Sequence, residues 1–184
     1  LEGVLKLEKL GFSRVVLSRE VPINEIEYIR NNCKVDLEIF VHGALCISYS
    51  GQCLFSSLVG GRSGNRGKCA QPCRLPYELL EDKNGTESVL DKGYLLSPRD
   101  LCSLDTLPTL VKLGINSFKI EGRMKTPEYV ATVTRIYRKY IDLALSGNKY
   151  VVDEADKLDL QQVFNRGGFS SGHLLSEPNR KLIF

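Results

Sequence analysis

The sequence predicts an α/β protein, namely the later half of a TIM-like (β/α) barrel with a long Cys-rich loop insertion. Short apolar runs alternate with amphipathic helical patterns along the chain, and such alternation is typical of a parallel sheet covered by helices. Residues 1–12 look like the end of a helix that leads into a strand, so the pattern begins inside a strand–helix unit. An open doubly wound sheet fits the alternation as well, but the start in mid-pattern favours half of a barrel.

Each expected element rests on its own local pattern. Short apolar runs predict strands over 14–18, 36–43, 94–97 and 115–122. Apolar residues at helical spacing predict helices over 22–32, 99–114 and 126–147. A turn sequence at 83–85 indicates a small hairpin over residues 76–90, between the second and third strands.

The helix expected over 126–147 has the clearest ends. Thr126 can cap its N-terminus, Pro127 suits the first helical position, and Gly147 follows the last turn. Its buried face is expected to comprise Val130, Val133, Tyr137, Ile141 and Ala144. Residues 1–150 are therefore assigned to the barrel half, and residues 151–184 to a helical and loop extension that leads to a missing C-terminal region.

Two expected strands differ between their two faces. In 36–43 one face is apolar and the other ends at His42, and in 115–122 the polar face carries Lys119 and Glu121. A strand covered on both faces would be apolar throughout, so these groups indicate the barrel interior, near the strand ends where barrel enzymes build their sites. The three are candidate catalytic residues, although a Lys–Glu pair that only braces the barrel is an equally good explanation.

Length and charge limit the possible functions. The 184 residues suffice for one domain with a sizeable core, and a net charge of +3 implies no polyelectrolyte partner for the protein as a whole. Residues 60–75, however, contain four basic residues and no acid, a local patch that would attract anions. No run is apolar for long enough to cross a bilayer and no signal-peptide pattern is present, so no membrane is involved and the cytoplasm is expected.

Four of the six cysteines lie in the loop over residues 43–75, spaced C-x6-C-x15-C-x3-C. They are Cys46, Cys53, Cys69 and Cys73. Four thiolates can enclose Zn²⁺ or hold an iron–sulfur cluster, and the wide first spacing in a glycine-rich loop favours the larger cluster. Cys102, expected near a strand end, is an alternative ligand. Such clustering in an α/β chain indicates a metal in a reduced compartment rather than disulfides.

The signatures of common hydrolases are absent from the sequence. Neither H-E-x-x-H nor G-x-S-x-G occurs, and only His42 and His173 could act as histidine bases. A Cys46–His42 nucleophile pair is conceivable, but it would leave the other three thiols unexplained.

Three stretches carry a family resemblance. EIFVHGALCISYSGQCLFS follows the pattern E-x-F-x-x-G-A-L-C-x4-G-x-C of the collagenase-like peptidase family (unclassified peptidase family 32), with Phe55 as the departure from an aliphatic preference. GRSGNRGKCAQPCRLPYEL and SFKIEGRMKTPEYV resemble the same family, particularly its branch similar to bacterial ribosomal-RNA hydroxylases. The recognisable motifs run from about Glu38 to Leu174 and cover most of the chain.

This resemblance implies a (β/α)-barrel-like catalytic domain, of which this chain would be the later part, with the rest of the barrel missing. Similar proteins carry a 4Fe–4S cluster on four cysteines and hydroxylate RNA bases, or a quinone precursor, without O₂ and with prephenate as oxygen donor. Others are named as collagen-degrading proteases. By position, the ligands would be Cys46, Cys53, Cys69 and Cys73, with Cys102 serving in some relatives.

Three functions follow from these observations. The first is an iron–sulfur-dependent, O₂-independent hydroxylase of an rRNA or tRNA base, in which basic side chains meet phosphates or a small dicarboxylate. The substrate-binding candidates are Arg62, Arg66, Arg74 and Arg123, with Lys68 beside them. In the same hypothesis His42, Lys119 and Glu121 orient the substrate or move protons. The second function is a peptidase, and the third is an RNA-binding module whose loop is stapled by zinc.

Overall fold

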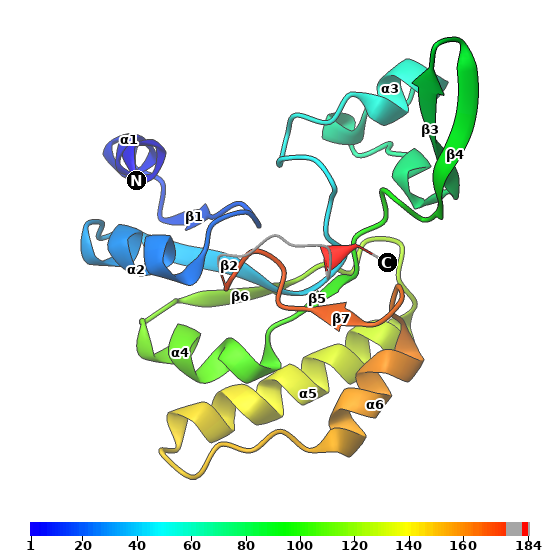
Figure 1. Ribbon diagram of the computed structural model, residues 1–184. Coiled ribbons are helices and arrows are strands. Elements are labelled where there is room, and N and C mark those ends of the chain that lie inside the picture. Colours follow the sequence, from blue (N-terminus) through cyan, green and yellow to red (C-terminus); the bar gives the residue numbers. More distant parts are fainter. Residues whose placement is uncertain (176–181, 184) are drawn as a thin grey trace.

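The computed structural model describes residues 1–175, 182 and 183, and it contains a mixed five-stranded sheet (Figure 1). The strands are β1 (Arg14–Val16), β2 (Asp36–Gly43), β5 (Asp100–Cys102), β6 (Ser117–Ile120) and β7 (Phe169–Ser170). β1 and β6 pair with β2 in parallel, whereas β5 pairs with the end of β2 antiparallel and with β7 in parallel. The α/β class is confirmed, but the expected parallel sheet is wrong at β5, and the described strands form no closed barrel.

Helices pack on the sheet, except for one short helix in the segment between β2 and β5. The helices are α1 (Glu2–Lys9), α2 (Ile23–Asn31), α3 (Phe55–Gly60), α4 (Leu107–Lys112), α5 (Pro127–Leu145) and α6 (Glu154–Val163). α4, α5 and α6 form a layer below the sheet in Figure 1. Their apolar residues pack with Leu37, Ile39 and Val41 of β2, which are at most 3% exposed. In the part of the chain that the structure describes, no helix is both long and apolar enough to span a membrane.

The buried face of α5 differs from the expected one. Thr126 caps the helix by accepting a hydrogen bond from the Tyr129 amide, and Pro127 begins it, as predicted. Val130, however, is 48% exposed, whereas Tyr129 and Tyr140 are each 1% exposed. The two rings can occupy the core because their hydroxyl groups find acceptors, the Glu121 carbonyl and the Asp156 carboxylate.

The strand expected over 94–97 is wrong, and the helix expected over 99–114 is wrong in part. Residues 94–97 form a turn, closed by a hydrogen bond from the Ser97 amide to the Tyr94 carbonyl. The strand is β5, inside the expected helix, and only the short turn η3 (Leu104–Thr106) and α4 are helical. Pairing of β5 with β2 and β7 supplies long-range contacts that a local apolar pattern does not contain.

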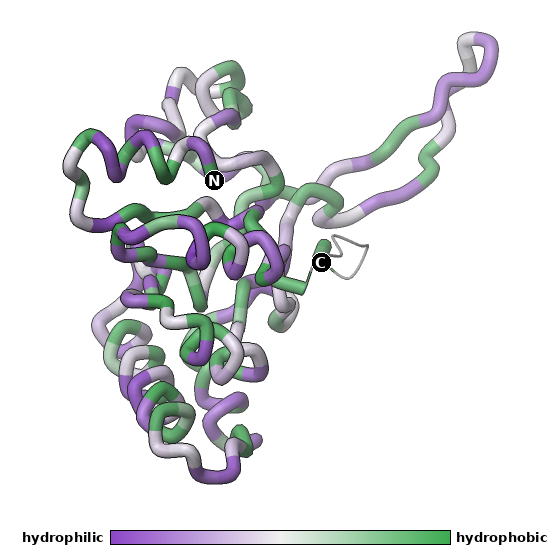
Figure 2. Tube along the Cα trace, turned by 90° about the vertical axis from the view of Figure 1, so that its left-hand side faces the viewer, coloured by the Kyte–Doolittle hydropathy of each residue, from purple (hydrophilic) through white to green (hydrophobic). Residues whose placement is uncertain are grey.

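Two segments extend from the sheet between β2 and β5. The first is the Cys-rich segment, residues 44–76, which contains α3 and the short turns η1 (Gly64–Arg66) and η2 (Pro72–Arg74). The second is the predicted hairpin, formed by β3 (Tyr77–Lys83) and β4 (Thr86–Gly93) as a separate sheet. Figure 2 shows this hairpin projecting far from the body of the molecule.

The residues after 150 also pack on this body. α6 lies against α5, where the Asp156 carboxylate accepts hydrogen bonds from Lys139 and Tyr140. β7 then adds to the sheet beside β5. This last strand brings the turn at residues 171–174 next to the start of α2, through a hydrogen bond from the Ile23 amide to the Leu174 carbonyl.

Candidate functional site

The site lies where β2 and β6 end. Gly43, the last residue of β2, has a φ of +104°, and a Cβ built on it would lie 2.5 Å from the Glu121 carbonyl oxygen. Only glycine fits such an approach. The strand ends can therefore lie close together, and the Cys-rich segment leaves β2 directly beside the loop that follows β6.

Hydrogen bonds fix the Cys-rich segment against its surroundings. The Glu20 carboxylate accepts from the Ser50 amide and hydroxyl at 2.8 and 3.0 Å. The Ser56 hydroxyl, on α3, accepts from the Ala70 amide at 2.9 Å. Arg123, in the loop after β6, donates to the Gly67 carbonyl. The segment is thus connected to the loops that follow both β1 and β6.

All four predicted thiols line one cavity of about 250 Å³, here called the thiol cavity. Its cysteines are Cys46, Cys53, Cys69 and Cys73. Burial raises the pKa of Cys73, the neighbouring Arg74 opposes this rise, and the other three thiols add to it. Within the described residues, no three His, Cys, Asp or Glu side chains converge closely enough to hold a single metal ion. The four thiols therefore share the lining of one cavity without converging on a single point.

Three of these thiols, Cys46, Cys69 and Cys73, also line a second cavity of about 200 Å³. Its charged residues are Arg19, Arg74, Glu121, Arg123, Lys125 and Arg166. We call it the anion cavity, because five of these six side chains are basic. Such a concentration of cations beside a partly buried space attracts carboxylates and phosphates.

The carboxylates at the anion cavity already have partners. Glu121 accepts from Arg19 at 2.7 Å, and the buried Asp100 accepts from Arg166 at 3.0 Å. Arg74, by contrast, donates to neutral acceptors, namely the Leu45 and Pro98 carbonyls and the Ser97 hydroxyl. Among the described residues no carboxylate forms an ion pair with Arg74, and burial lowers its pKa.

Lys125 is a site residue that the sequence analysis missed. Burial lowers its pKa to about 8, with Arg166 and Arg74 adding to the decrease and Asp100 and Glu121 opposing it. Its ammonium group lies over the Phe164 ring. The preceding residue, Met124, has a φ of +59°, and a non-glycine residue in this region is strained, which often marks a functional loop. No local pattern of apolar or charged residues indicates that strain.

The structure separates the three predicted catalytic residues. Glu121 lines the anion cavity. Lys119 is instead 44% exposed and pairs with Glu38 of β2 at 3.6 Å, so a Lys–Glu pair between the two strands is present. His42 is 1% exposed, lies under the site among aromatic rings, and lines neither of the two cavities.

The burial of His42 makes it a weak base. Burial, together with the positive charge of Lys125, lowers the pKa of the imidazole to about 4. Nδ1 lies 3.3 Å from the Tyr137 hydroxyl, which itself donates to the Val41 carbonyl. Because the hydroxyl proton is already donated to Val41, we assign the ring proton to Nδ1, which then donates to the Tyr137 oxygen. Nε2 is buried without a hydrogen-bond partner among the described residues.

The other predicted residues divide into two groups. Arg74 and Arg123 line the anion cavity. Arg62 and Arg66 lie on the outside of the Cys-rich segment and line neither cavity, and Arg62 donates to the Lys68 carbonyl at 3.0 Å. Cys102 is on β5 beside the Tyr137 hydroxyl, at 3.8 Å, and does not line the thiol cavity.

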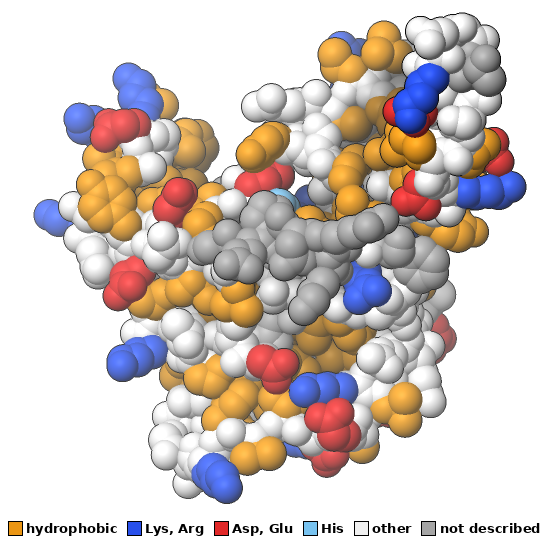
Figure 3. All heavy atoms as spheres, viewed as in Figure 1, with side chains coloured by type: hydrophobic (Ala, Val, Ile, Leu, Met, Phe, Trp, Pro, Cys, Tyr) orange, Lys and Arg blue, Asp and Glu red, His pale blue; other side chains and the backbone are white. Residues whose placement is uncertain are grey.

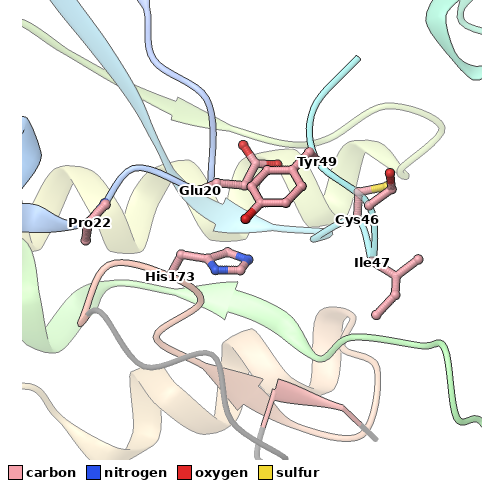
Figure 4. Close-up of a pocket in the computed structure, with 7 residues that line it drawn as sticks. Glu20, Pro22, Cys46, Ile47, Tyr49 and His173 are labelled. Carbon is pink, nitrogen blue, oxygen red and sulfur yellow. The ribbon is translucent and has the colours of Figure 1, made fainter. Parts of the chain in front are cut away.

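A third cavity, of about 290 Å³, is also lined by Cys46 (Figure 4). It is lined by Glu20, Pro22, Cys46, Ile47, Ser48, Tyr49 and His173, and we call it the Tyr49 cavity. On the same side of the molecule, Figure 3 shows a hollow between the N-terminal elements and the lobe that carries α3. The exposed Cys46 thus lines all three cavities.

The chain belongs to a known family. The model of peptidase family U32 matches residues 1–183, which confirms the resemblance found in the sequence motifs. No solved structure matches the chain.

Curated relatives have two kinds of name. An uncharacterized protease of Methanocaldococcus jannaschii is 46% identical over 93% of this chain and 43% of its own length. A tRNA hydroxylation protein of Bacillus subtilis is 43% identical over 72% of this chain and 32% of its own. A 23S rRNA 5-hydroxycytidine synthase of Escherichia coli is 43% identical over 74% of this chain and 20% of its own. All three names are those of enzymes or RNA-modifying proteins, and the chain spans less than half of each relative.

Proposed function

We propose that this chain is part of an iron–sulfur-dependent hydroxylase that acts on a base of rRNA or tRNA without O₂. The observation that carries the proposal is that all four cysteines of the Cys-rich segment line one cavity. This cavity adjoins a second one, which is lined by five basic residues. Two relatives with 43% identity have names that describe RNA hydroxylation. Reduced thiols and an RNA substrate both favour the cytoplasm as its location.

In this proposal Cys46, Cys53, Cys69 and Cys73 hold a 4Fe–4S cluster. When bound, the cluster would supply the electron transfer that an O₂-independent hydroxylation requires. The chain's own contribution is to hold the four thiols around the thiol cavity. η2, which carries Cys73, is connected to the body of the protein through the hydrogen bonds of Arg74.

The anion cavity is the proposed site of the oxygen donor, a small dicarboxylate that the family resemblance suggests is prephenate. The guanidinium of Arg74 can bind a carboxylate through two parallel hydrogen bonds. Lys125, whose pKa is about 8, can hold or release a proton at Nζ near neutral pH. Glu121 holds Arg19 at the rim through their 2.7 Å ion pair.

We further propose that the described sheet is the later part of a TIM-like barrel. β1, β2 and β6 run in parallel, and helices follow β1 and β6. The anion cavity lies at the C-terminal ends of β2 and β6, where barrel enzymes carry their sites. In a structure of the whole protein, the further strands should close on the free edges of β1 and β6.

The cluster is tested by anaerobic purification of the whole protein and analysis of iron and acid-labile sulfide. The wild type should contain both in similar amounts, and Cys73→Ser should lose most of them. Cys33→Ser is the matched control, since Cys33 is buried in the core and does not line the thiol cavity. One zinc ion without sulfide would contradict the proposal and favour the zinc-stapled module. Mass spectrometry of nucleosides from cells that lack the gene would then identify the modified base.

A cysteine peptidase is a second candidate, because Cys46 and His173 line the same cavity and a thiol beside an imidazole can act as a nucleophile. The sequence had suggested His42 for this role, but that side chain is buried and does not line the Tyr49 cavity. Gelatin cleavage by pure protein that His173→Ala abolishes, with iron content unchanged, would support the peptidase.

A further inference from the structure

We propose that the Tyr49 cavity receives the RNA base that is to be modified, with the Tyr49 ring as its stacking platform. The inference deepens the proposed function and rests on it. Figure 4 shows Glu20, Tyr49 and His173 around one opening, with Cys46 at its side. These residues come from three separate segments of the chain, so the cavity exists only in the folded protein.

The chemistry of the cavity suits a flat and uncharged ring. Tyr49 is 69% exposed and Ile47 is 38% exposed, although both are large and apolar. An exposed aromatic ring beside a cavity is the usual platform on which proteins stack unpaired bases. At about 290 Å³, the cavity is close to the lower limit for small-molecule sites, about 300 Å³.

Charge separates this cavity from its neighbour. Glu20 is the acidic member of the lining, and among the residues that the structure describes no lysine or arginine lines the cavity. Hydrogen bonds from backbone and from Ser50 and Ser18 lower the pKa of Glu20 against the effect of burial, so the group is ionised at neutral pH. A phosphate or dicarboxylate would be repelled here and attracted to the anion cavity. A base offers ring and amino hydrogen atoms that Glu20 and His173 can accept.

Close packing at Gly172 fixes the two sides of the cavity relative to each other. Gly172, with a φ of +59°, packs so closely that a Cβ there would lie 3.1 Å from Leu101 and 3.3 Å from Leu45. Leu45 precedes Cys46, and Gly172 precedes His173. The turn that carries His173 is therefore seated directly on the residue before the exposed thiol, and its distance from Cys46 is set by packing rather than by a flexible loop.

The position of the cavity matches the chemistry of the proposed function. Cys46 and Tyr49 line both the Tyr49 cavity and the thiol cavity. A base stacked on Tyr49 would thus lie against the wall of the thiol cavity, while the anion cavity adjoins the same thiols from another side. The basic residues Arg62, Arg66 and Lys68, which stayed outside the cavities, would then contact the RNA backbone rather than the reacting atoms.

The experiment uses the whole protein, purified anaerobically, and a short single-stranded RNA that carries the fluorescent base pyrrolocytosine. Stacking should quench its emission in the wild type and in Tyr49→Phe. Tyr49→Ala should lose the quenching and bind about 5- to 150-fold more weakly, the range expected for one stacked base. Tyr28→Ala is the matched control, since Tyr28 is 59% exposed on α2, away from the cavity.

The outcomes separate this inference from the proposed function. Unchanged binding and quenching in Tyr49→Ala would overturn the inference, and so would gelatin cleavage that depends on His173. Iron and sulfide are measured on the same samples. A wild type without a cluster whose quenching still depends on Tyr49 would refute the hydroxylase but retain the base site. A protein with a cluster whose quenching does not depend on Tyr49 would refute the base site but retain the hydroxylase.

Discussion

The anion cavity and the Tyr49 cavity share Cys46 but differ in almost every other respect. The first is lined by five basic residues, and its acidic member is paired with one of them. The second has an exposed aromatic ring, a histidine and a carboxylate, and no lysine or arginine from the described part of the chain lines it. In the proposed function, Cys46 would therefore lie between a site for an anion and a site for a neutral ring. An enzyme that joins an anionic donor to a base needs such a division.

The largest change in ligand binding at one cavity but not at the other is expected from Arg74→Met. The variant removes a charge from the anion cavity and leaves buried acceptors at Leu45, Pro98 and Ser97 without their donor. Loss of one charged hydrogen bond to a bound carboxylate costs about 1.5–3 kcal/mol, so binding of prephenate should weaken by about 10- to 150-fold. Calorimetric titration measures it. Quenching of pyrrolocytosine RNA should be unchanged, and an equal loss at both sites would contradict the division.

Gly172→Ala should have the opposite selectivity: it should weaken RNA quenching and leave prephenate binding intact. The added Cβ meets Leu101 and Leu45, and the positive φ strains any residue other than glycine. We expect unfolding to become easier by about 1–2 kcal/mol, and RNA quenching to weaken because His173 and Cys46 move apart. Urea denaturation and fluorescence measure the two effects. The matched control is Gly114→Ala, which has a positive φ but open space around its Cβ position. Prephenate binding should be retained in both variants.

A smaller effect is expected from pH. Because the pKa of Lys125 is lowered to about 8, its positive charge is present below that pH and lost above it. Prephenate binding should therefore weaken several-fold between about pH 7 and pH 9, whereas pyrrolocytosine quenching should not change in parallel. Arg166, Arg74, Asp100 and Glu121 are the charged groups that act on Lys125. Lys125→Arg stays charged throughout the range, so a pH dependence that persists in this variant would exclude Lys125 as its source.

The smallest effect is expected from Lys119→Met. Lys119 is 44% exposed and pairs with Glu38 rather than with a cavity residue. Exposed ion pairs contribute about 0–1 kcal/mol, so stability, prephenate binding and RNA quenching should all remain close to wild type. A large loss of hydroxylation would show that the sequence-based catalytic assignment was correct after all. Glu121→Gln is the comparison variant, since Glu121 does line the anion cavity.

The sequence alone was sufficient for features with a local cause. The strand at β2, the N-terminal cap of α5 and the hairpin turn all follow from short patterns of apolar and turn residues. The four thiols and the family motifs were equally visible, because the Cys-rich segment contains them within one stretch of chain.

Long-range packing was required for the rest. β5 became a strand because β2 and β7 pair with it, against a local pattern that favours a helix. Arg19, Lys125 and Arg166 joined the thiols through the ends of β1, β6 and α6, which no spacing along the chain connects. His42 and Lys119 lie on the polar faces of their strands, as Glu121 does, yet the first is buried and the second is exposed, whereas Glu121 lines the anion cavity. Periodicity reveals which face of an element a residue occupies, but the charges and cavities beside that face depend on contacts between distant segments.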